Sequence, residues 1–250
     1  MAAASRHERE RLLALLHERD KRIAQRRFYA LFPDGDGEFA GEAIHARAGY
    51  PRHLEFFEAG AQYRERCFMA ANRVGKSVAG AFETACHLTG EYPDWWRGRR
   101  FTRPVRAWAA GKTNETTRDI VQSVLLGDIT GGGTAGSKGL SGTGIVPGAA
   151  LGKVSWKAGI PDLVDTVRVK HASGGWSTLG LKSYQQGRGS FEGTAQHVIW
   201  MDEEPPADVY GECLVRTATT QGIVMLTFTP LEGMSEVVLQ FLPGSTPHAA

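Results

Sequence analysis

The chain has 250 residues, 42% of them hydrophobic and 22% charged, with a formal net charge of +2. This length and composition fit one large α/β domain or two smaller ones, and the small net charge neither requires nor excludes a nucleic-acid partner. The three cysteines lie far apart without a CxxC pair, so neither a disulfide framework nor a zinc site is supported. The charged N-terminus argues against a signal peptide, and no apolar run approaches the ~18 residues of a membrane span.

The first segment with a clear pattern is residues 5–31, which we predict to be a helix. Ser5 followed by Glu8 fits a capping box, and apolar residues then recur at helical spacing. The segment 33–37, PDGDG, contains the proline and glycines that end such a helix. We therefore expect an N-terminal helix and linker over residues 1–37.

Strands and helices alternate from about Tyr50 onward. The sequence predicts strands at 66–71, 105–110, 197–201 and 223–228, helices at 77–88 and 116–126, and a hairpin over 167–184 that turns at 172–175. The glycine-dense stretch 131–152 is left unassigned. Because apolar runs alternating with helices are typical of strands buried on both faces, we expect an α/β fold with a mostly parallel central sheet flanked by helices.

One segment matches the phosphate-loop pattern GxxxxGK[ST] except at its first position, where Ala70 replaces glycine. A predicted strand precedes it and a predicted helix follows, so its backbone N–H groups would surround phosphates at the positive end of a helix. The Lys76 ammonium would reach the β- and γ-phosphates, and the Ser77 hydroxyl would bind Mg²⁺. The predicted nucleotide-binding residues of this loop are Ala70, Ala71, Asn72, Arg73, Val74, Gly75, Lys76 and Ser77.

A second GK[ST] triplet, Gly111-Lys112-Thr113, also follows a predicted strand. The triplet alone is therefore weak evidence, because either copy could be an ordinary turn from a strand into a helix. Only Lys76 stands in the order that nucleotide motors require, with an acidic strand end further along the chain. We therefore assign phosphate binding to the first copy.

The acidic strand end is His197 to Glu204, HVIWMDEE, an apolar strand followed by three carboxylates. Open α/β sheets present ligands at the carboxyl ends of their strands. Asp202 would hold Mg²⁺ opposite Ser77, and Glu203 would activate the attacking water as general base. The alternative is that these acids only begin a loop and cap the next helix. The upstream phosphate loop favours the first interpretation.

Four blocks occur in a fixed order along the chain: FMAANRVGKS at 68–77, KSYQQGRGSFEGT at 182–194, VIWMDEEPP at 198–206 and LTFTPLEGM at 226–234. Together they resemble the N-terminal packaging ATPase domain of the large terminase subunit of tailed bacteriophages. The resemblance covers about residues 50–242.

The resemblance implies a P-loop fold of the additional-strand, catalytic-glutamate type, with ATP and Mg²⁺ as cofactors. It implies that ATP hydrolysis drives translocation of double-stranded viral DNA into a procapsid. The implied partners are the portal protein, the small terminase subunit and further copies of the chain in a ring, with no membrane. The implied location is the cytoplasm of the infected host, transiently docked on the procapsid.

The resemblance also assigns roles to individual residues. It places Lys76 and Ser77 at the phosphate and Mg²⁺ positions, Asp202 at the second Mg²⁺ position and Glu203 at the catalytic glutamate. Thr227 and Thr229 match the motif that couples hydrolysis to movement, although threonine also favours β-strands for ordinary reasons.

Two further roles are open at this stage. Arg73, within the phosphate loop, could stabilise transition-state charge in cis. The competing candidate for this role, the arginine finger, is Arg216 or an arginine of a neighbouring subunit. For adenine, Tyr50 and His53 are the candidates, although the family pattern usually has glutamine where His53 stands.

Trp95 to Arg100, WWRGRR, mixes aromatic and basic residues as nucleic-acid surfaces do. The alternative is a loop anchored by tryptophan with a solvated charged rim.

We expect the ATPase domain to cover residues 38–242 and a flexible tail or linker to cover 243–250. After the coupling block only Glu232 and Glu236 remain as acids, too few for the carboxylate cluster of a two-metal nuclease. Nuclease activity is therefore not expected in this chain. The competing interpretations are a helicase-like nucleic-acid-remodelling ATPase, a small-molecule kinase and a ring component with a degenerate nucleotide pocket.

Overall fold

The structure is a computed structural model that describes residues 11, 12, 15, 26–133, 137–231 and 233–242. Its contacts divide the chain into two units, Met1–Pro51 and Arg52–Ala250. Most of the helix predicted for residues 5–31 lies outside the described residues, as do Glu232 and the predicted tail at 243–250. No described helix is long and apolar enough to cross a bilayer.

The first unit contains short elements that pair locally. They are α2 (Arg27–Ala30), the antiparallel strands β1 (Gly37–Phe39) and β2 (Glu42–Ile44), and η1 (Arg47–Gly49). The Arg47 guanidinium donates to the Asp34 carboxylate. The contact-based division falls at Pro51, and the boundary at residue 37 stays a prediction.

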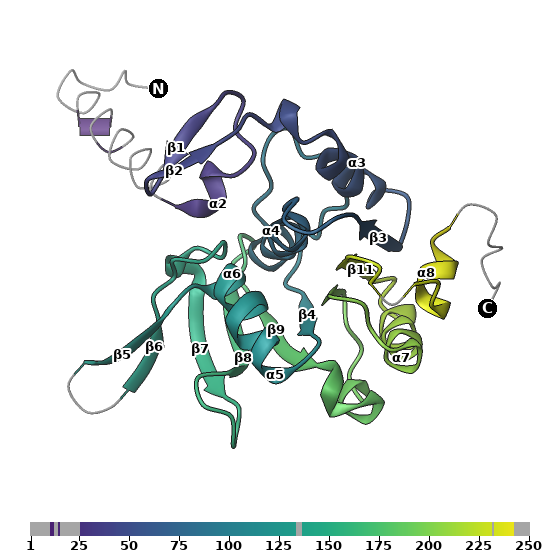
Figure 1. Ribbon diagram of the computed structural model, residues 1–250. Coiled ribbons are helices and arrows are strands. Elements are labelled where there is room, and N and C mark those ends of the chain that lie inside the picture. Colours follow the sequence, from purple (N-terminus) through teal and green to yellow (C-terminus); the bar gives the residue numbers. More distant parts are fainter. Residues whose placement is uncertain (1–10, 13–14, 16–25, 134–136, 232, 243–250) are drawn as a thin grey trace. The chain divides into compact units, whose positions relative to one another are not determined.

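The second unit contains a seven-stranded sheet in the order β3-β11-β10-β4-β9-β8-β7 (Figure 1). The first five strands run parallel, and β8 and β7 add antiparallel strands at one edge. The predicted mostly parallel sheet is thus confirmed. The strands are β3 (Glu65–Met69), β4 (Arg106–Gly111), β7 (Leu151–Trp156), β8 (Val164–Lys170), β9 (Trp176–Ser183), β10 (Val198–Asp202) and β11 (Ile223–Phe228).

Strand β11 lies between the strand of the phosphate loop and the acidic strand. It pairs in parallel with β3 on one side and with β10 on the other. This is the additional strand that the P-loop fold was expected to contain. It separates β3 from β10 by two strand spacings, ~10 Å, and so leaves room for phosphates between their carboxyl ends.

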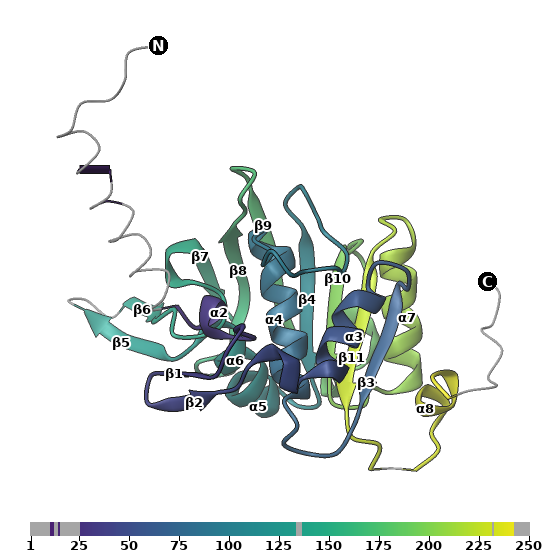
Figure 2. The same cartoon turned by 90° about the horizontal axis from the view of Figure 1, so that it is seen from above.

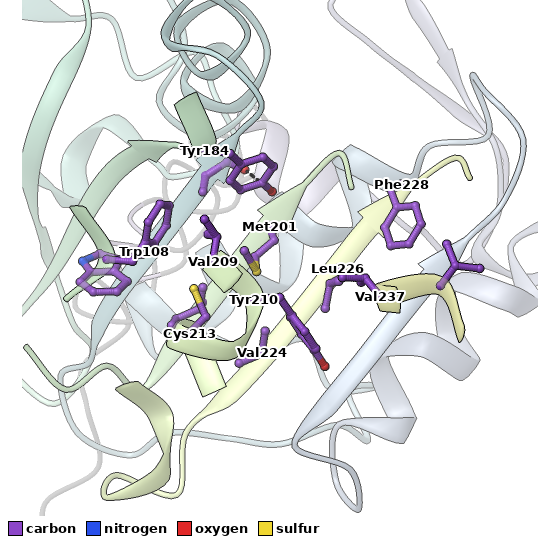
Figure 3. Packing of buried hydrophobic residues seen from close by; sticks show 14 residues of the cluster. Trp108, Tyr184, Met201, Val209, Tyr210, Cys213, Val224, Leu226, Phe228 and Val237 are labelled. Atoms are coloured by element: carbon purple, nitrogen blue, oxygen red, sulfur yellow. Dashed lines mark hydrogen bonds between the residues drawn. The ribbon is translucent and has the colours of Figure 1, made fainter. Parts of the chain in front are cut away.

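Helices cover both faces of these central strands. The face with Trp200 and Thr227 packs against α4 (Lys76–Thr89), twelve of whose fourteen residues are buried. The alternate residues of β10 and β11, Met201 and Leu226 among them, pack against α7 (Ala207–Ala218) and α8 (Glu236–Gln240), as Figure 3 shows. The strict alternation of β-strands therefore assigns each side chain to one of two cores.

The remaining predicted elements are confirmed with small differences. The helix predicted at 116–126 is a continuous helical segment with a wide turn in its middle, made of α5 (Asn114–Thr116), η2 (Thr117–Gln122) and α6 (Ser123–Leu126). Thr113 caps its start. The predicted hairpin is β8 and β9, closed by the bond from the His171 amide to the Gly175 carbonyl at 2.9 Å.

The unassigned glycine-dense stretch contains structure that its pattern did not reveal. It holds parts of a second antiparallel pair, β5 (Ile129–Gly133) and β6 (Ser137–Leu140), then η3 (Gly148–Ala150) and the start of edge strand β7. Beyond β9 follow the short helical turns η4 (Tyr184–Gln186) and η5 (Arg188–Phe191). The helix α3 (Pro51–Ala59) precedes β3.

The WWRGRR segment is a tryptophan-anchored loop. Trp95 stacks on Phe82 of α4 with ring centroids 6.0 Å apart, and Trp96 is buried against Phe57 at 5.1 Å. Both indoles thus serve the core, and contact of this segment with DNA remains a prediction.

A buried charged network ties α4 to β3. The Arg66 guanidinium donates to both carboxylate oxygens of Glu83, at 2.6 and 3.1 Å, and His87 Nε2 lies 3.2 Å from Glu83. The Tyr92 hydroxyl accepts a bond from the Phe101 amide, so its own proton can go to His87 Nδ1, 3.0 Å away. Burial disfavours the Glu83 carboxylate, but Arg66 and the His87 hydrogen bond outweigh it and lower the Glu83 pKa.

We predict that Glu83→Gln lowers the free energy of unfolding by ~3–5 kcal/mol, because it leaves the Arg66 guanidinium buried without a counter-charge. Chemical denaturation followed by circular dichroism measures the change. Glu55→Gln is the control, because Glu55 pairs with Arg52 on the surface at 2.7 Å, and we expect it to cost less than ~1 kcal/mol. Equal effects of the two substitutions would contradict the prediction.

Candidate nucleotide-binding site

The phosphate loop connects β3 to α4 and has two residues in the left-handed backbone region. Arg73 has φ +61° and Gly75 has φ +83°. A side chain at Gly75 would also lie 3.1 Å from His53 Nε2, so glycine is needed there for both backbone and space. Ala70 is not among the described residues with positive φ. The loop therefore accepts alanine at its first position.

His53 lies beneath this loop. Its side chain is buried, its ring meets Phe68 edge-on at 4.8 Å, and it packs against Gly75. Burial lowers its pKa, although hydrogen bonds with the loop backbone oppose the shift. The structure thus shows His53 as a support of the loop, and its contact with adenine stays a prediction. Tyr50 belongs to the first unit, where its ring meets Phe32 edge-on at 5.7 Å, so its adenine contact is equally untested.

Lys76 begins α4 with its ammonium held over the loop. Nζ donates to the Ala71 carbonyl at 2.6 Å and to Thr229 Oγ1 at 2.9 Å. Burial lowers the Lys76 pKa, and the nearby Asp202 and Glu203 carboxylates oppose that shift. The lysine therefore lies between the loop and both acids of the predicted site.

Ser77 and Asp202 are brought into direct contact, although 125 positions separate them. Ser77 Oγ donates to the two carboxylate oxygens at 2.8 and 3.1 Å. Asp202 is 3% exposed, and burial raises its pKa to about 6 despite its bonds from Thr227 and Ser77. A hydroxyl and a carboxylate side by side at the phosphate loop fit Mg²⁺, which takes one or two protein oxygens together with substrate phosphates.

Thr227 connects Asp202 to the core. Its hydroxyl donates to Asp202 Oδ1 at 2.7 Å and accepts a bond from Trp200 Nε1, also at 2.7 Å. The indole N–H can only donate, so the single Thr227 proton is directed toward the carboxylate. This chain of hydrogen bonds orients the Asp202 carboxylate, whose Oδ1 also accepts the bond from Ser77.

Gly80 lets α4 approach this indole. A side chain at position 80 would overlap Trp200 Nε1. The first turn of α4, which carries Ser77, is thus in contact with the same Trp200 that orients Thr227. Sequence reasoning missed both Gly80 and Trp200, although Gly80 lies three residues after Ser77 on the predicted helix.

Glu203 follows Asp202 with φ +68°, a left-handed conformation that costs a non-glycine residue ~1–3 kcal/mol. Its amide donates to the Thr227 carbonyl at 3.1 Å. The buried Tyr184 hydroxyl reaches the Asp202 carbonyl at 2.9 Å and the Glu203 carbonyl at 3.1 Å. These bonds hold the bend that turns the Glu203 side chain out of the sheet, where it is exposed. Tyr184 is a further residue that sequence reasoning missed as a site component.

The site is a cavity of about 230 Å³ at the carboxyl edge of the sheet. Its lining includes eight residues that the sequence predicted: Asn72, Arg73, Gly75, Lys76, Ser77, Glu203, Thr227 and Thr229. Val78 and Phe228 complete it. Ala70, Ala71 and Val74 shape the loop without lining the cavity.

The second GK[ST] triplet lies in a different place. Lys112 and Thr113 line a neighbouring cavity of about 600 Å³ together with Glu204 and Glu236. Arg216 is also remote, because its carbonyl accepts a bond from the Gln196 amide just before β10 begins, at the amino-terminal edge of the sheet. Of the two arginines considered within this chain, Arg73 is thus the one that lies at the cavity and could stabilise transition-state charge.

Comparison with known proteins adds an independent finding. Residues 67–250 match the family described as terminase large subunit, T4-like-virus type, N-terminal. The terminase large subunit of Salmonella phage P22 is 43% identical over 218 residues, which cover 80% of this chain and 42% of that protein.

Two solved structures are also similar. One is the large terminase of a thermophilic bacteriophage in complex with ADP, at 12% identity and a TM-score of 0.45, covering 71% of this chain and 38% of that one. The other is the HK97 bacteriophage large terminase, at 11% identity and a TM-score of 0.48. The match covers 84% of this chain and 37% of that one. The chain spans less than half the length of each of these relatives.

The two GK[ST] triplets should differ in nucleotide affinity. We expect Lys76→Ala to weaken ATP binding by roughly 10–100-fold, because it removes a charged hydrogen-bond donor at the loop. Lys112→Ala should leave the affinity within about twofold. Titration with a fluorescent ATP analogue measures both, and equal losses would show that the wrong loop was assigned.

Thr227→Val keeps the side-chain volume but removes both hydrogen bonds of the Thr227 hydroxyl, the one from Trp200 and the one to Asp202. We expect the Mg²⁺ concentration needed for half-maximal ATP hydrolysis to rise by roughly 10–100-fold, as for other residues that orient a metal ligand. Thr227→Ser retains the hydroxyl and is the control. Adding Trp200→Phe to Thr227→Val should cause little further loss, since both remove the same bond. Fully additive losses would argue against the series of hydrogen bonds from Trp200 through Thr227 to Asp202.

Proposed function

The chain belongs to the family of phage terminase large subunits, and from that premise we propose that it is the ATP-hydrolysing motor domain of a DNA-packaging terminase. In this proposal, hydrolysis of ATP drives double-stranded viral DNA into a procapsid. The observation that carries it is the direct contact of Ser77 with Asp202 at 2.8 Å, beside Lys76 and Glu203. The sheet order, with β11 between β3 and β10, supports the same proposal.

The residues that we place around the nucleotide have separate chemical tasks. The backbone of residues 71–75 surrounds the phosphates, and Lys76 neutralises charge on the β,γ side. Ser77 and Asp202 hold Mg²⁺, which when bound neutralises negative charge on the phosphates. Glu203 accepts the proton of the attacking water, as general base. Its exposed position next to the metal-binding acid suits a group that must reach a water molecule.

Coupling is the task of Thr227 and Thr229. Thr227 bonds the metal-binding acid at 2.7 Å, and Thr229 accepts a bond from Lys76 at 2.9 Å. Thr227 lies near the end of β11, the strand inserted between the loop strand and the acidic strand, and Thr229 directly follows that strand. A change in phosphate charge would therefore act on one strand through two separate bonds.

Arg73 is the transition-state arginine in this proposal, acting in cis. It lies in the loop, lines the cavity and is exposed. The competing residue is an arginine supplied by a neighbouring copy of the chain in a ring. The portal protein, the small terminase subunit and viral DNA are the proposed partners. Tyr50 and His53 remain the proposed adenine contacts.

We expect Glu203→Gln to bind Mg²⁺-ATP with near-normal affinity and to hydrolyse it ~10²–10⁴-fold more slowly, because only the general base is lost. Phosphate release under saturating ATP measures the rate. The matched control is Glu204→Gln, whose carboxylate accepts a bond from Ser235 at the neighbouring cavity. If Glu203→Gln hydrolyses ATP at the wild-type rate, the assignment of the base is wrong.

A further inference from the structure

The amino-terminal edge of the sheet, opposite the nucleotide cavity, is formed by five segments of the second unit: 60–64, 90–106, 170–175, 195–197 and 218–222. They contact one another. The His197 amide donates to the Arg106 carbonyl at 2.8 Å, Gly175 lies directly against Pro104, and the rings of Phe101 and His197 meet at 6.3 Å. Figure 2 shows the turn between β8 and β9 and the loop before β4 on the same side of the sheet.

This edge has far more positive charge than the chain as a whole. Its segments contain two carboxylates, Glu91 and Asp94, against seven cationic residues: Arg64, Arg97, Arg99, Arg100, Arg103, Arg106 and Lys170. That is a balance of +5, whereas the whole chain has a net charge of only +2. The rest of the chain is therefore net negative, and the positive charge is concentrated away from the ATP site.

The centre of this edge has uncompensated positive charge. The Arg99 pKa is lowered by burial and by the nearby Arg64, and the His197 pKa is lowered by burial, Arg106 and Arg99. Among the residues that the structure describes, no ion pair includes Arg64, Arg99 or Arg106. Like charges are held together here without a neighbouring carboxylate to offset them.

Neutral groups hold the arginines in place. Arg64 donates to the carbonyls of Gly222 and Thr217 at 3.0 and 3.1 Å. Arg100 donates to the Trp96 carbonyl at 3.2 Å, and Arg99 lies over the Phe101 ring at 4.9 Å. Carbonyls and rings orient a guanidinium but leave its charge in place, together with several of its five N–H donors. The edge is thus preorganised to bind an anion.

The size of this edge indicates a polymeric anion. From β3, next to Arg64, to β8, which ends at Lys170, the sheet has five strand spacings, or about 24 Å. A mononucleotide is much shorter than that distance. Duplex DNA presents a charge every ~1.7 Å along its axis and can occupy the full length.

We propose that the amino-terminal edge of the sheet binds the phosphate backbone of double-stranded DNA without reading its sequence. This inference rests on the proposed packaging function and gives its substrate a location. ATP and DNA then occupy opposite edges of one sheet, joined by β11 and its neighbours. The WWRGRR segment takes part through its arginines, while its tryptophans anchor the loop to the core.

The test compares two double variants that lose the same charge. Arg99→Gln with Arg106→Gln removes two unpaired arginines of the edge, and Arg52→Gln with Arg118→Gln removes two arginines of exposed ion pairs. The probe is a fluorescent duplex of ~20 base pairs, whose binding is followed by anisotropy over a range of KCl concentrations. Thermal unfolding checks that both variants are folded.

We expect the edge variant to lose at least about tenfold in affinity and the slope of log affinity against log salt to fall by ~1.8, or ~0.9 for each lost phosphate contact. The control should keep both values. Equal losses in the two variants, or no duplex binding by the wild type, would overturn the proposal. Stronger competition by polyglutamate than by duplex DNA would also overturn it, and would indicate an acidic protein partner instead.

ATP hydrolysis without DNA should be unchanged in both variants. A wild-type chain that binds the duplex but does not hydrolyse ATP would refute the proposed motor function and leave the DNA surface standing. A chain that hydrolyses ATP but binds no duplex would refute the proposed DNA surface and leave the proposed ATPase standing. The two proposals therefore fail separately.

Discussion

The hydrogen bonds that converge on the Asp202 carboxylate are the interaction on which the site depends. Ser77 reaches it from α4 and Thr227 from β11, so one buried acid joins the loop, the acidic strand and the strand between them. Burying a carboxylate costs several kcal/mol unless it is hydrogen-bonded or paired. The same burial raises the Asp202 pKa to about 6, so in the proposed site a bound Mg²⁺ would be a favourable replacement for a proton.

Close packing between α4 and the sheet is what allows that convergence. Gly80 admits the Trp200 indole, and the indole orients Thr227 by occupying its acceptor position. The buried pair of Arg66 and Glu83 lies one turn further along the same helix and joins it to β3. The helix that begins with Lys76 is thus bound to the sheet by a charge network and by an apolar contact.

The two edges of the sheet suit different kinds of ligand. The carboxyl edge gathers Lys76, Ser77 and Glu203 around a cavity of about 230 Å³, which suits one compact ligand. The amino edge has Arg64 before β3, further arginines in the segment before β4, and Lys170 at the end of β8, a distribution that suits an extended ligand. Parallel strands make this division possible, because every strand contributes one end to each edge. In the proposed motor, strand β11 lies at the nucleotide-binding site at its carboxyl end and beside Arg64 at its amino end.

The sequence by itself determined the local features of this protein. Spacing and order were sufficient to predict β3, α4, β10, β11 and the family, because phosphate loops and acidic strand ends are encoded by neighbouring residues. The assignment of phosphate binding to Lys76 and not to Lys112 rests on the same order and stays a prediction. Only the tertiary structure decided which side chains meet. The sequence already placed Asp202 opposite Ser77, but that Trp200 directs Thr227, and that Arg64, Arg99 and Arg106 gather at one edge, depends on strand order, which no local pattern encodes. The glycine-dense stretch remained unassigned for the same reason, since β7 is a strand only because β8 pairs with it.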